Sequence, residues 1–283
     1  MTGPDGPLEL PYTDTGPVGV EPPALLLVHG WGADARTWAP LLPLLAARHR
    51  VLTVDVRGHG GSAVPPDTGD ADAAVRRFDP EVIAGDLLAV LDRSGVHRPV
   101  AVGHSWGGQL VTALAATHPD RVAGLVVLDP AYGARSAAEL LAMRERWYSP
   151  EAREALRDFA ESAFVADTPD PVRDQVLAGF RDTDRRVLAD AFVAMYLTPR
   201  SFGLRAATEA YLERVKAPTL SVYSSDEAAD WARGLPAPAG SRVVAWPGAG
   251  HYLHAERPKP LARLIENWLP QIHMPGSGDA GRR

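Results

Sequence analysis

Short apolar runs of strand length, each ending at a glycine or another turn residue, recur through the first half of the chain and alternate with segments of helix length. They lie at residues 24–29 (ALLLVH), 51–56 (VLTVDV), 99–103 (PVAVG) and 125–129 (LVVLD). Strands that helices cover on both faces are apolar throughout, because neither face meets water. The pattern therefore predicts an α/β fold built on a mostly parallel sheet.

Helices are predicted after several of these strands, at residues 80–94, 106–118 and 258–268. From residue 132 to about residue 214 no strand-like run occurs, and several helical stretches follow one another. Strand-like runs resume at 219–223 (TLSVY) and 242–246 (RVVAW). The sequence therefore predicts a core made of residues 1–131 and 215–283, with a helical insertion of residues 132–214.

The composition limits the chemistry that is available. The 283 residues include no cysteine, which excludes disulfides, thiolate metal sites and a cysteine nucleophile. Serine, threonine and carboxylate side chains remain for covalent chemistry. No HExxH motif or other paired spacing of histidines indicates a metal. We therefore expect neither a metal nor another cofactor.

Charge and hydropathy limit the partners. A net charge of −6 gives no basic surface for binding phosphate backbones. The first 19 residues lack a basic head followed by an apolar run of signal-peptide length, and the longest apolar runs fall far short of the ~20 residues that span a bilayer. We expect a cytoplasmic protein that acts on a small molecule and binds neither nucleic acid nor membrane. The sequence does not indicate an oligomeric state.

Residues 103–107 read Gly-His-Ser-Trp-Gly, where an apolar strand stops and a helix begins. A sharp strand-to-helix turn raises a serine hydroxyl above the sheet, and flanking glycines permit the strained backbone. The turn also places Ser105 at a helix N-terminus, where backbone N–H groups stabilise developing negative charge. Ser105 is therefore the predicted nucleophile. The alternative is a chance match in which Ser105 only caps the helix.

Residues 29–32, His-Gly-Trp-Gly, directly follow the first apolar run. Acyl transfer needs two N–H donors for the oxyanion, one from the residue after the nucleophile and one from an early strand-to-loop turn. These donors would be the backbone N–H groups of Trp106 and Trp31. Taken alone, the tetrapeptide could also be an ordinary glycine turn.

A histidine follows the last predicted strand, in the glycine-rich loop 247–251 (PGAGH). This loop leads into the last helix, which is where the chain order serine, acid, histidine requires the base. We therefore predict that His251 is the general base. His254 is the alternative, and a packing or capping role suits it better.

Four ordered motifs resemble the α/β-hydrolase family and together cover about residues 8–269. They are GHSWG at 103–107, HGWG at 29–32, DVRGHGGS at 55–62, and Gly250-His251 followed by Glu256-Arg257-Pro258. The resemblance implies an eight-stranded, mostly parallel sheet flanked by helices, with a helical cap inserted after strand six. We place the first two strands near residues 8–13. In the third motif we expect Asp55 and Arg57 to form an internal ion pair rather than to take part in chemistry.

The resemblance implies two places for the acid that orients the histidine. The more usual one is the loop after strand seven, here Ser-Ser-Asp-Glu at 224–227, which lacks the usual Gly-Glu-x-Asp pattern. Ser224 and Glu227 also match a helix capping box, which gives the acidic pair a structural role. The other place is Asp129, at the end of strand six before a proline, where an aspartate often only fixes a turn. We favour Asp129, keep Asp226 as the alternative and place Glu227 third.

The resemblance and these side chains imply a carboxylesterase-like serine hydrolase that cleaves an ester, lactone or thioester through an acyl-enzyme. Aromatic residues of the insertion would roof the site, which favours a substrate with a hydrophobic portion. A serine argues against relatives that open epoxides or displace halide, because those reactions need a carboxylate nucleophile. Three alternatives stay open: a cofactor-free perhydrolase or haloperoxidase, a carbon–carbon bond hydrolase, and a noncatalytic ligand-binding module on the same fold.

Overall fold

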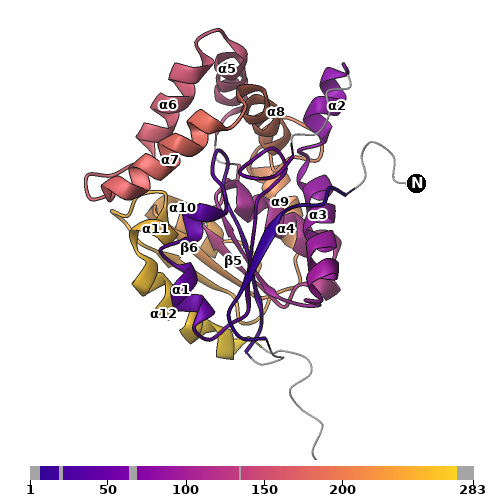
Figure 1. Cartoon of the computed structure of the whole chain (residues 1–283), viewed down its shortest axis with the longest axis vertical. Coiled ribbons are helices and arrows are strands. Elements are labelled where there is room, and N and C mark those ends of the chain that lie inside the picture. The colour runs from indigo at the N-terminus through magenta and orange to yellow at the C-terminus, as the bar shows by residue number, and fades with distance from the viewer. Residues whose placement is uncertain (1–6, 19–21, 64–68, 134, 273–283) are drawn as a thin grey trace, which may run out of the picture.

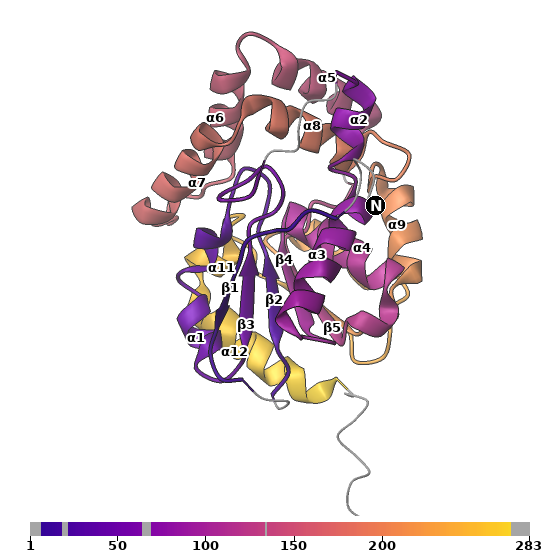
Figure 2. The ribbon, with the colours of Figure 1, turned by 45° about the vertical axis from the view of Figure 1, so that its right-hand side comes forward.

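Figure 1 shows a computed structural model of the chain, which describes residues 7–18, 22–63, 69–133 and 135–272. Both ends of the predicted core, and part of the N-terminal stretch that we expect to lack an export signal, lie outside these residues. A twisted sheet forms the centre, with helices on both faces and further helices above one end (Figures 1 and 2). Within the described residues, no helix combines the length and the hydropathy needed to cross a membrane.

The described chain forms one seven-stranded sheet in the order β1-β3-β2-β4-β5-β6-β7. β1 runs antiparallel to β3, and every other pairing is parallel. The strands are β1 (Tyr12–Thr15), β2 (Leu25–Val28), β3 (Val51–Val54), β4 (Val100–His104), β5 (Gly124–Leu128), β6 (Thr219–Tyr223) and β7 (Arg242–Ala245). The predicted α/β class with a mostly parallel sheet is confirmed.

The expected eighth strand is not present among the described residues. Residues 8–13, which we assigned to two strands, supply only the start of β1. At Leu8 and Leu10 the backbone bonds to side chains of α3 (Pro80–Ser94): the N–H of Leu8 donates to Asp86 (2.6 Å), and Arg93 donates to the carbonyl of Leu10 (2.5 Å). The helical insertion consequently follows the fifth strand, β5, rather than a sixth.

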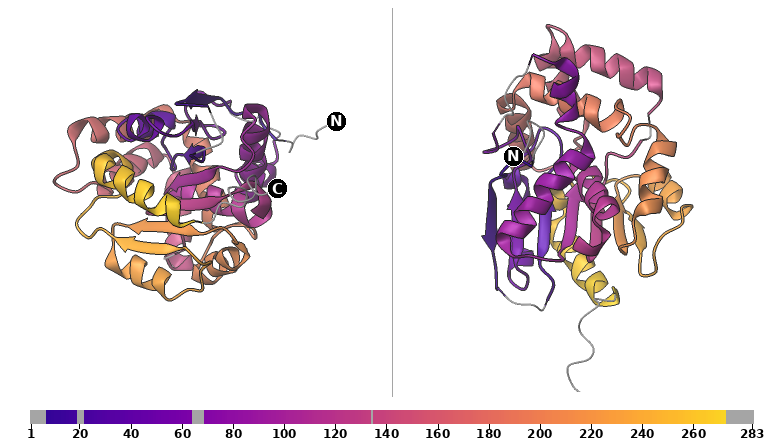
Figure 3. Two further views of the ribbon diagram at one scale, coloured as in Figure 1. Left: turned by 90° about the horizontal axis from the view of Figure 1, so that it is seen from below. Right: turned by 90° about the vertical axis from the view of Figure 1, so that its right-hand side faces the viewer.

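Helices cover both faces of the sheet (Figure 3). Successive strand residues point to opposite faces. On one face Leu26 and Val54 belong to the apolar core under α3 and α4 (Trp106–Thr117). On the other, Leu27 and Val102 belong to the core under α1 (Leu42–Ala46) and α12 (Pro258–Trp268). Every residue of β2, β3, β4 and β5 is buried, which explains why these strands show no polar alternation.

Between β5 and β6 the described residues form five helices. They are α5 (Ala137–Tyr148), α6 (Ala152–Ser162), α7 (Asp170–Asp182), α8 (Arg185–Tyr196) and α9 (Arg205–Arg214). The first four, which we call the upper helices, lie above the carboxyl ends of the parallel strands (Figures 1 and 2). α9 returns to the side of the sheet and packs against α4. The remaining short helices are η1 (Ala35–Trp38), α2 (Ala71–Arg76), η2 (Pro119–Arg121), α10 (Asp226–Arg233), α11 (Leu253–Glu256) and η3 (Leu269–Gln271).

A buried ion pair ties the loop after β3 to α3. Arg57 donates from Nε and Nη2 to the two carboxylate oxygens of Asp86, at 2.7 and 2.6 Å. The expected pairing of Arg57 with Asp55 is therefore wrong. Asp55 instead accepts the backbone N–H groups of Ala35 (2.7 Å) and Gly61 (2.8 Å), so its carboxylate joins two loops at the same end of the sheet.

We expect Arg57→Met to destabilise the fold, because it leaves the carboxylate of Asp86 buried without its partner. Loss of one member of a buried pair costs about 3–5 kcal/mol, which urea unfolding can measure. The double variant Arg57→Met/Asp86→Leu removes both charges and should recover most of the loss. A single variant as stable as the wild type would contradict this role for the pair.

Candidate active site

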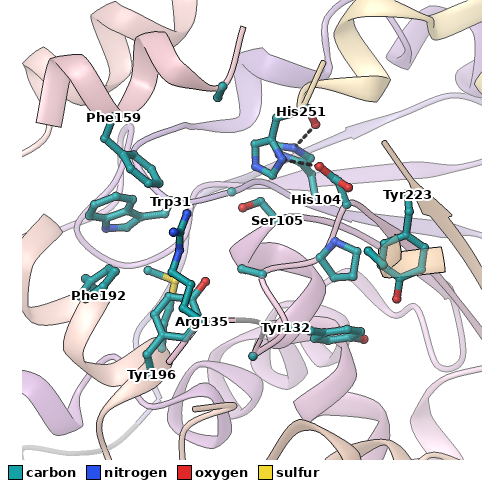
Figure 4. A pocket seen from close by; sticks show the side chains of 18 of the residues that line it. Trp31, His104, Ser105, Tyr132, Arg135, Phe159, Phe192, Tyr196, Tyr223 and His251 are labelled. Atoms are coloured by element: carbon teal, nitrogen blue, oxygen red, sulfur yellow. Dashed lines mark hydrogen bonds and ion pairs between the residues drawn. The ribbon is translucent and has the colours of Figure 1, made fainter. Parts of the chain in front are cut away.

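A cavity of about 350 Å³ lies between the carboxyl ends of the strands and the upper helices. Ser105, His251 and Trp31 line it from the sheet side, and Phe159 and Phe192 line it from the upper helices (Figure 4). A cavity of this size holds a small organic molecule. The predicted nucleophile and the predicted base therefore line the same cavity.

Ser105 occupies a strained turn between β4 and α4, with φ 52° and ψ −116°. Backbone hydrogen bonds hold it there. Its N–H donates to the carbonyl of Leu128 (2.9 Å), and its own carbonyl accepts from Gly108 (2.9 Å) and Ala131 (3.0 Å). A non-glycine residue at positive φ costs about 1–3 kcal/mol and persists only where its surroundings impose it. The sequence motif thus folds into the sharp turn that it predicts.

Glycines are required around this turn because backbones meet there. A Cβ at position 103 would lie 2.2 Å from the carbonyl oxygen of Gly107, and one at Gly107 would lie 2.2 Å from that of Val28. A Cβ at Gly108 would lie 2.7 Å from the Cβ of Pro130. A larger side chain at any of these positions would push α4 away from the ends of β2, β4 or β5.

The structure brings His251 together with Asp129, which lies 122 positions earlier in the chain. Nδ1 of His251 lies 2.7 Å from Oδ2 of Asp129. Asp129 directly follows β5 at φ 43°, and Ser224 follows the neighbouring β6. Ser224 donates its N–H to Oδ1 (3.0 Å) and its hydroxyl to Oδ2 (2.9 Å) of Asp129.

These contacts decide the protonation of Asp129. Burial raises the pKa of this carboxyl, but the hydrogen bonds from His251 and Ser224 outweigh burial and bring the pKa below its usual value. Asp129 is therefore a carboxylate at neutral pH. As such it accepts the Nδ1–H of His251, which leaves Nε2 as the nitrogen with a free lone pair.

The alternative acids lie elsewhere. Asp226 is the exposed first residue of α10. The helix is capped by Ser225 rather than by Ser224, so the predicted capping box is wrong by one residue. This shift frees Ser224 to hold Asp129. The carboxylate of Glu227 is 89% exposed, so the structure places Asp129, and neither of the other two acids, against the imidazole.

Two further histidines pack around His251. His254 is buried and its Nε2 lies 2.9 Å from the Thr37 hydroxyl, as a packing role requires. His104 is also buried, and its Nε2–H donates to the carbonyl of His251 (2.9 Å). Burial lowers the pKa of His254 to about 3 and that of His104 well below its usual value, so both rings are neutral.

Sequence reasoning missed the contributions of His104 and Ser224 to this site. A histidine at the buried end of β4, inside the serine motif, was the available signal for the first. In the described chain, no group of three or more histidine and carboxylate side chains is arranged to hold a metal ion.

The loop with the predicted oxyanion donor is anchored in the upper helices. The indole Nε1–H of Trp31 donates to the carbonyl of Leu188 in α8 (3.0 Å), and its ring lies edge-on to Phe180 of α7, with centroids 5.2 Å apart. A Cβ at Gly179 would lie 2.2 Å from the carbonyl oxygen of Gly32. The backbone of α7 therefore touches this loop directly.

The sheet order, the strained serine turn and the grouping of serine, histidine and aspartate are features of the α/β-hydrolase fold. Residues 23–258 match the alpha/beta hydrolase fold family. The chain belongs to this family, as the resemblance of its motifs predicts.

Several relatives are enzymes of known or assigned activity. A fluoroacetate dehalogenase from a Burkholderia species is 37% identical over 133 residues, 46% of this chain and 42% of that protein. The chain spans less than half the length of the first curated relatives that it matches.

Among solved structures, an esterase from Thermogutta terrifontis with malate bound has a TM-score of 0.76 and 25% identity, with 94% of both chains covered. An enol-lactonase from Burkholderia xenovorans LB400 has a TM-score of 0.73 and 25% identity, with 92% of this chain and 96% of the lactonase covered. These matches support a hydrolase activity.

The free energy of unfolding contributed by Asp129 should fall as the pH is lowered. The folded pKa lies below the unfolded value of about 3.9, so the contribution is fully present above that value and is lost as the pH falls through the lower, folded pKa. Urea unfolding of the wild type and of Asp129→Asn should differ more at about pH 6 than at about pH 3. Ser224→Ala, which removes one donor, should weaken this dependence in part. A difference that stays constant with pH would contradict the argument.

Proposed function

We propose that the protein is a serine hydrolase that cleaves a carboxylic ester, lactone or thioester through an acyl-enzyme intermediate. One observation carries the proposal. The imidazole of His251, which lies 2.7 Å from Asp129, and Ser105, which sits in a strained turn, line the same cavity. In the proposed reaction, His251 takes the proton of Ser105 as the hydroxyl attacks the carbonyl carbon. It then passes this proton to the leaving group, and water releases the acid in the same way.

The proposed oxyanion donors are the backbone N–H groups of Trp31 and Trp106. Trp106 is the first residue of α4, where the N–H groups have no partner inside the helix. The orientation of the Trp31 N–H follows from His29. The N–H of Val56 donates to Nε2 of His29 (2.9 Å), so Nδ1 carries the proton and donates to the carbonyl of Gly30 (2.8 Å).

This bond fixes one peptide unit. The carbonyl of Gly30 and the N–H of Trp31 belong to the same planar trans peptide and point in opposite directions. With the carbonyl held toward the buried ring of His29, the N–H is held toward the opposite side. His29 is therefore a positioning residue in the proposal. Because it holds the N–H of Trp31 in place before the reaction, this donor need not reorient when the oxyanion forms.

We propose that the upper helices form a cap over the site, within an insertion of residues 132–214 in a core of residues 1–131 and 215–283. Their contribution to the cavity is largely apolar. It includes Met143, Phe159, Phe180, Phe192 and Met195. Such a lining favours a substrate with a hydrophobic portion. The esterase and enol-lactonase among the similar structures fit this substrate class.

Other activities are less well supported. The named dehalogenase is similar over less than half of this chain, and attack by an ester-forming carboxylate would need an acid where Ser105 stands. Carbon–carbon bond hydrolysis and peracid formation would use the same three side chains. Peracid formation from acetate and peroxide, assayed beside ester hydrolysis, distinguishes a perhydrolase from a plain hydrolase.

A fluorophosphonate probe should label Ser105 in the folded protein, because the probe reacts with serines that a histidine activates. Peptide mapping by mass spectrometry should find the adduct at Ser105 and find none in Ser105→Ala. A screen over acyl chain lengths, lactones and thioesters, run with both proteins, should show hydrolysis by the wild type alone. Folded protein that takes no label and cleaves none of these would favour the noncatalytic ligand-binding module.

Asp129→Asn should lower kcat by about 10⁴-fold, because an asparagine favours the wrong tautomer of the histidine. Asp226→Asn is the matched control and should change kcat little, since Asp226 is exposed at the start of α10. The steady-state hydrolysis of the best ester from the screen measures both. A large loss in Asp226→Asn together with an active Asp129→Asn would reverse the assignment of the acid.

A further inference from the structure

Arg135, just before α5, lines the same cavity as Ser105. In Figure 4 its side chain points into the cavity, and the residue as a whole is exposed, so its guanidinium group lies at the solvent-accessible part of the cavity. Most side chains around it are aromatic or aliphatic. A guanidinium group in such a place is a fixed positive charge in the cavity that Ser105 also lines.

No carboxylate of the described chain forms an ion pair with Arg135. Glu139 is near enough for Arg135 to contribute to its lowered pKa, but its carboxylate is bonded to the N–H and the hydroxyl of Ser136 (2.8 and 2.7 Å). Asp129, the one carboxylate among the described residues that line the cavity, is held by His251. The positive charge of Arg135 is therefore available to a ligand.

The second arginine of the cavity provides a contrast. The guanidinium carbon of Arg205 lies 4.9 Å from the centroid of the Trp231 ring, and its Nη2 lies 3.8 Å from Glu227. Stacking and a nearby acid account for the position of Arg205. Among the described residues, Arg135 has no stacked ring and no acid within ion-pair distance.

Tyr196 adds a neutral donor next to this charge. It lines the cavity beside Arg135 (Figure 4). Burial raises the pKa of Tyr196 to about 12, with a smaller opposing contribution from Arg135, so its hydroxyl stays protonated. A guanidinium group and a phenol hydroxyl together suit an anionic oxygen pair, and charge-assisted bonds of this kind are stronger than bonds between neutral groups.

We propose that the cavity selects substrates that carry a carboxylate in addition to the scissile acyl group, and that Arg135 binds this carboxylate. The inference rests on the proposed hydrolase function and narrows its substrates to anionic esters, lactones or thioesters with an apolar body. Arg135 makes no covalent contribution. It holds the substrate so that the acyl carbon lies at Ser105.

The test compares acids with their primary amides, which have nearly the same shape but no charge. The monoethyl esters of glutaric, adipic and suberic acid, each beside its terminal amide, place the charge on the acyl side. 3-Acetoxypropanoate and its amide place it on the alcohol side. For at least one pair, wild-type kcat/KM should be about tenfold or more higher for the acid, the size expected of a hydrogen bond between charged groups.

Arg135→Gln should lower the acid-to-amide ratio of kcat/KM about tenfold, mainly through KM for the acid. Arg146→Gln is the matched control. It removes the same charge from an exposed position on α5 that does not line the cavity, and should leave both the ratio and the activity unchanged. Equal kcat/KM for acid and amide in every pair, or a ratio that Arg135→Gln does not change, would overturn the proposal while ester hydrolysis stands.

A binding measurement separates failure of this proposal from failure of the proposed function. Isothermal titration of Ser105→Ala with monoethyl adipate and with its amide requires no turnover. Tighter binding of the acid, lost in Ser105→Ala/Arg135→Gln, would support the carboxylate site even if the wild type hydrolysed none of the esters. Equal binding of acid and amide to Ser105→Ala would count against it whatever the catalytic result.

Discussion

The backbone conformation of Ser105 is the constraint on which the site depends. In the described chain, Ser105 and Asp129 are the two residues other than glycine with positive φ, and they end the neighbouring strands β4 and β5. Hydrogen bonds hold both strained conformations. The N–H of Ser105 donates to the carbonyl of Leu128, and the N–H of Asp129 donates to the carbonyl of Val222 at 2.8 Å. The stability of the parallel sheet thus maintains the two unfavourable turns, and the turns aim both side chains at one cavity.

Sequence reasoning reached the fold class, the family and the side chains that meet in the cavity, because each depends on local pattern. An apolar run without alternation indicates a strand buried on both faces. Gly103 and Gly107 are required because a Cβ at either position would lie 2.2 Å from a backbone carbonyl oxygen. Local pattern was not enough to choose between Asp129 and Asp226, because the choice depends on which strand end faces the loop of His251.

The features that sequence reasoning missed depend on contacts between distant segments. The described chain has one strand fewer than predicted, because the backbone at Leu8 and Leu10 bonds to Asp86 and Arg93 of α3. The partner of Arg57 was misassigned because Asp86 is 29 positions away and reaches it only once α3 packs on the sheet. The cap of α10 was predicted at Ser224 instead of Ser225, and for this reason the role of Ser224 in holding Asp129 was missed. None of these contacts has a local sequence signature.

The upper helices and the proposed oxyanion loop form one packed unit. Trp31 carries both a backbone N–H proposed to face the substrate and an indole that packs on α7 and bonds to α8, so any movement of these helices moves that N–H. The contact between Gly179 and Gly32 removes the space in which the loop could relax independently. Because packed interfaces shift between discrete arrangements rather than deforming continuously, displacement of α7 by a substrate would reposition an oxyanion donor. In the proposed mechanism, the packing of the upper helices over the cavity is therefore coupled to the position of the oxyanion donor Trp31.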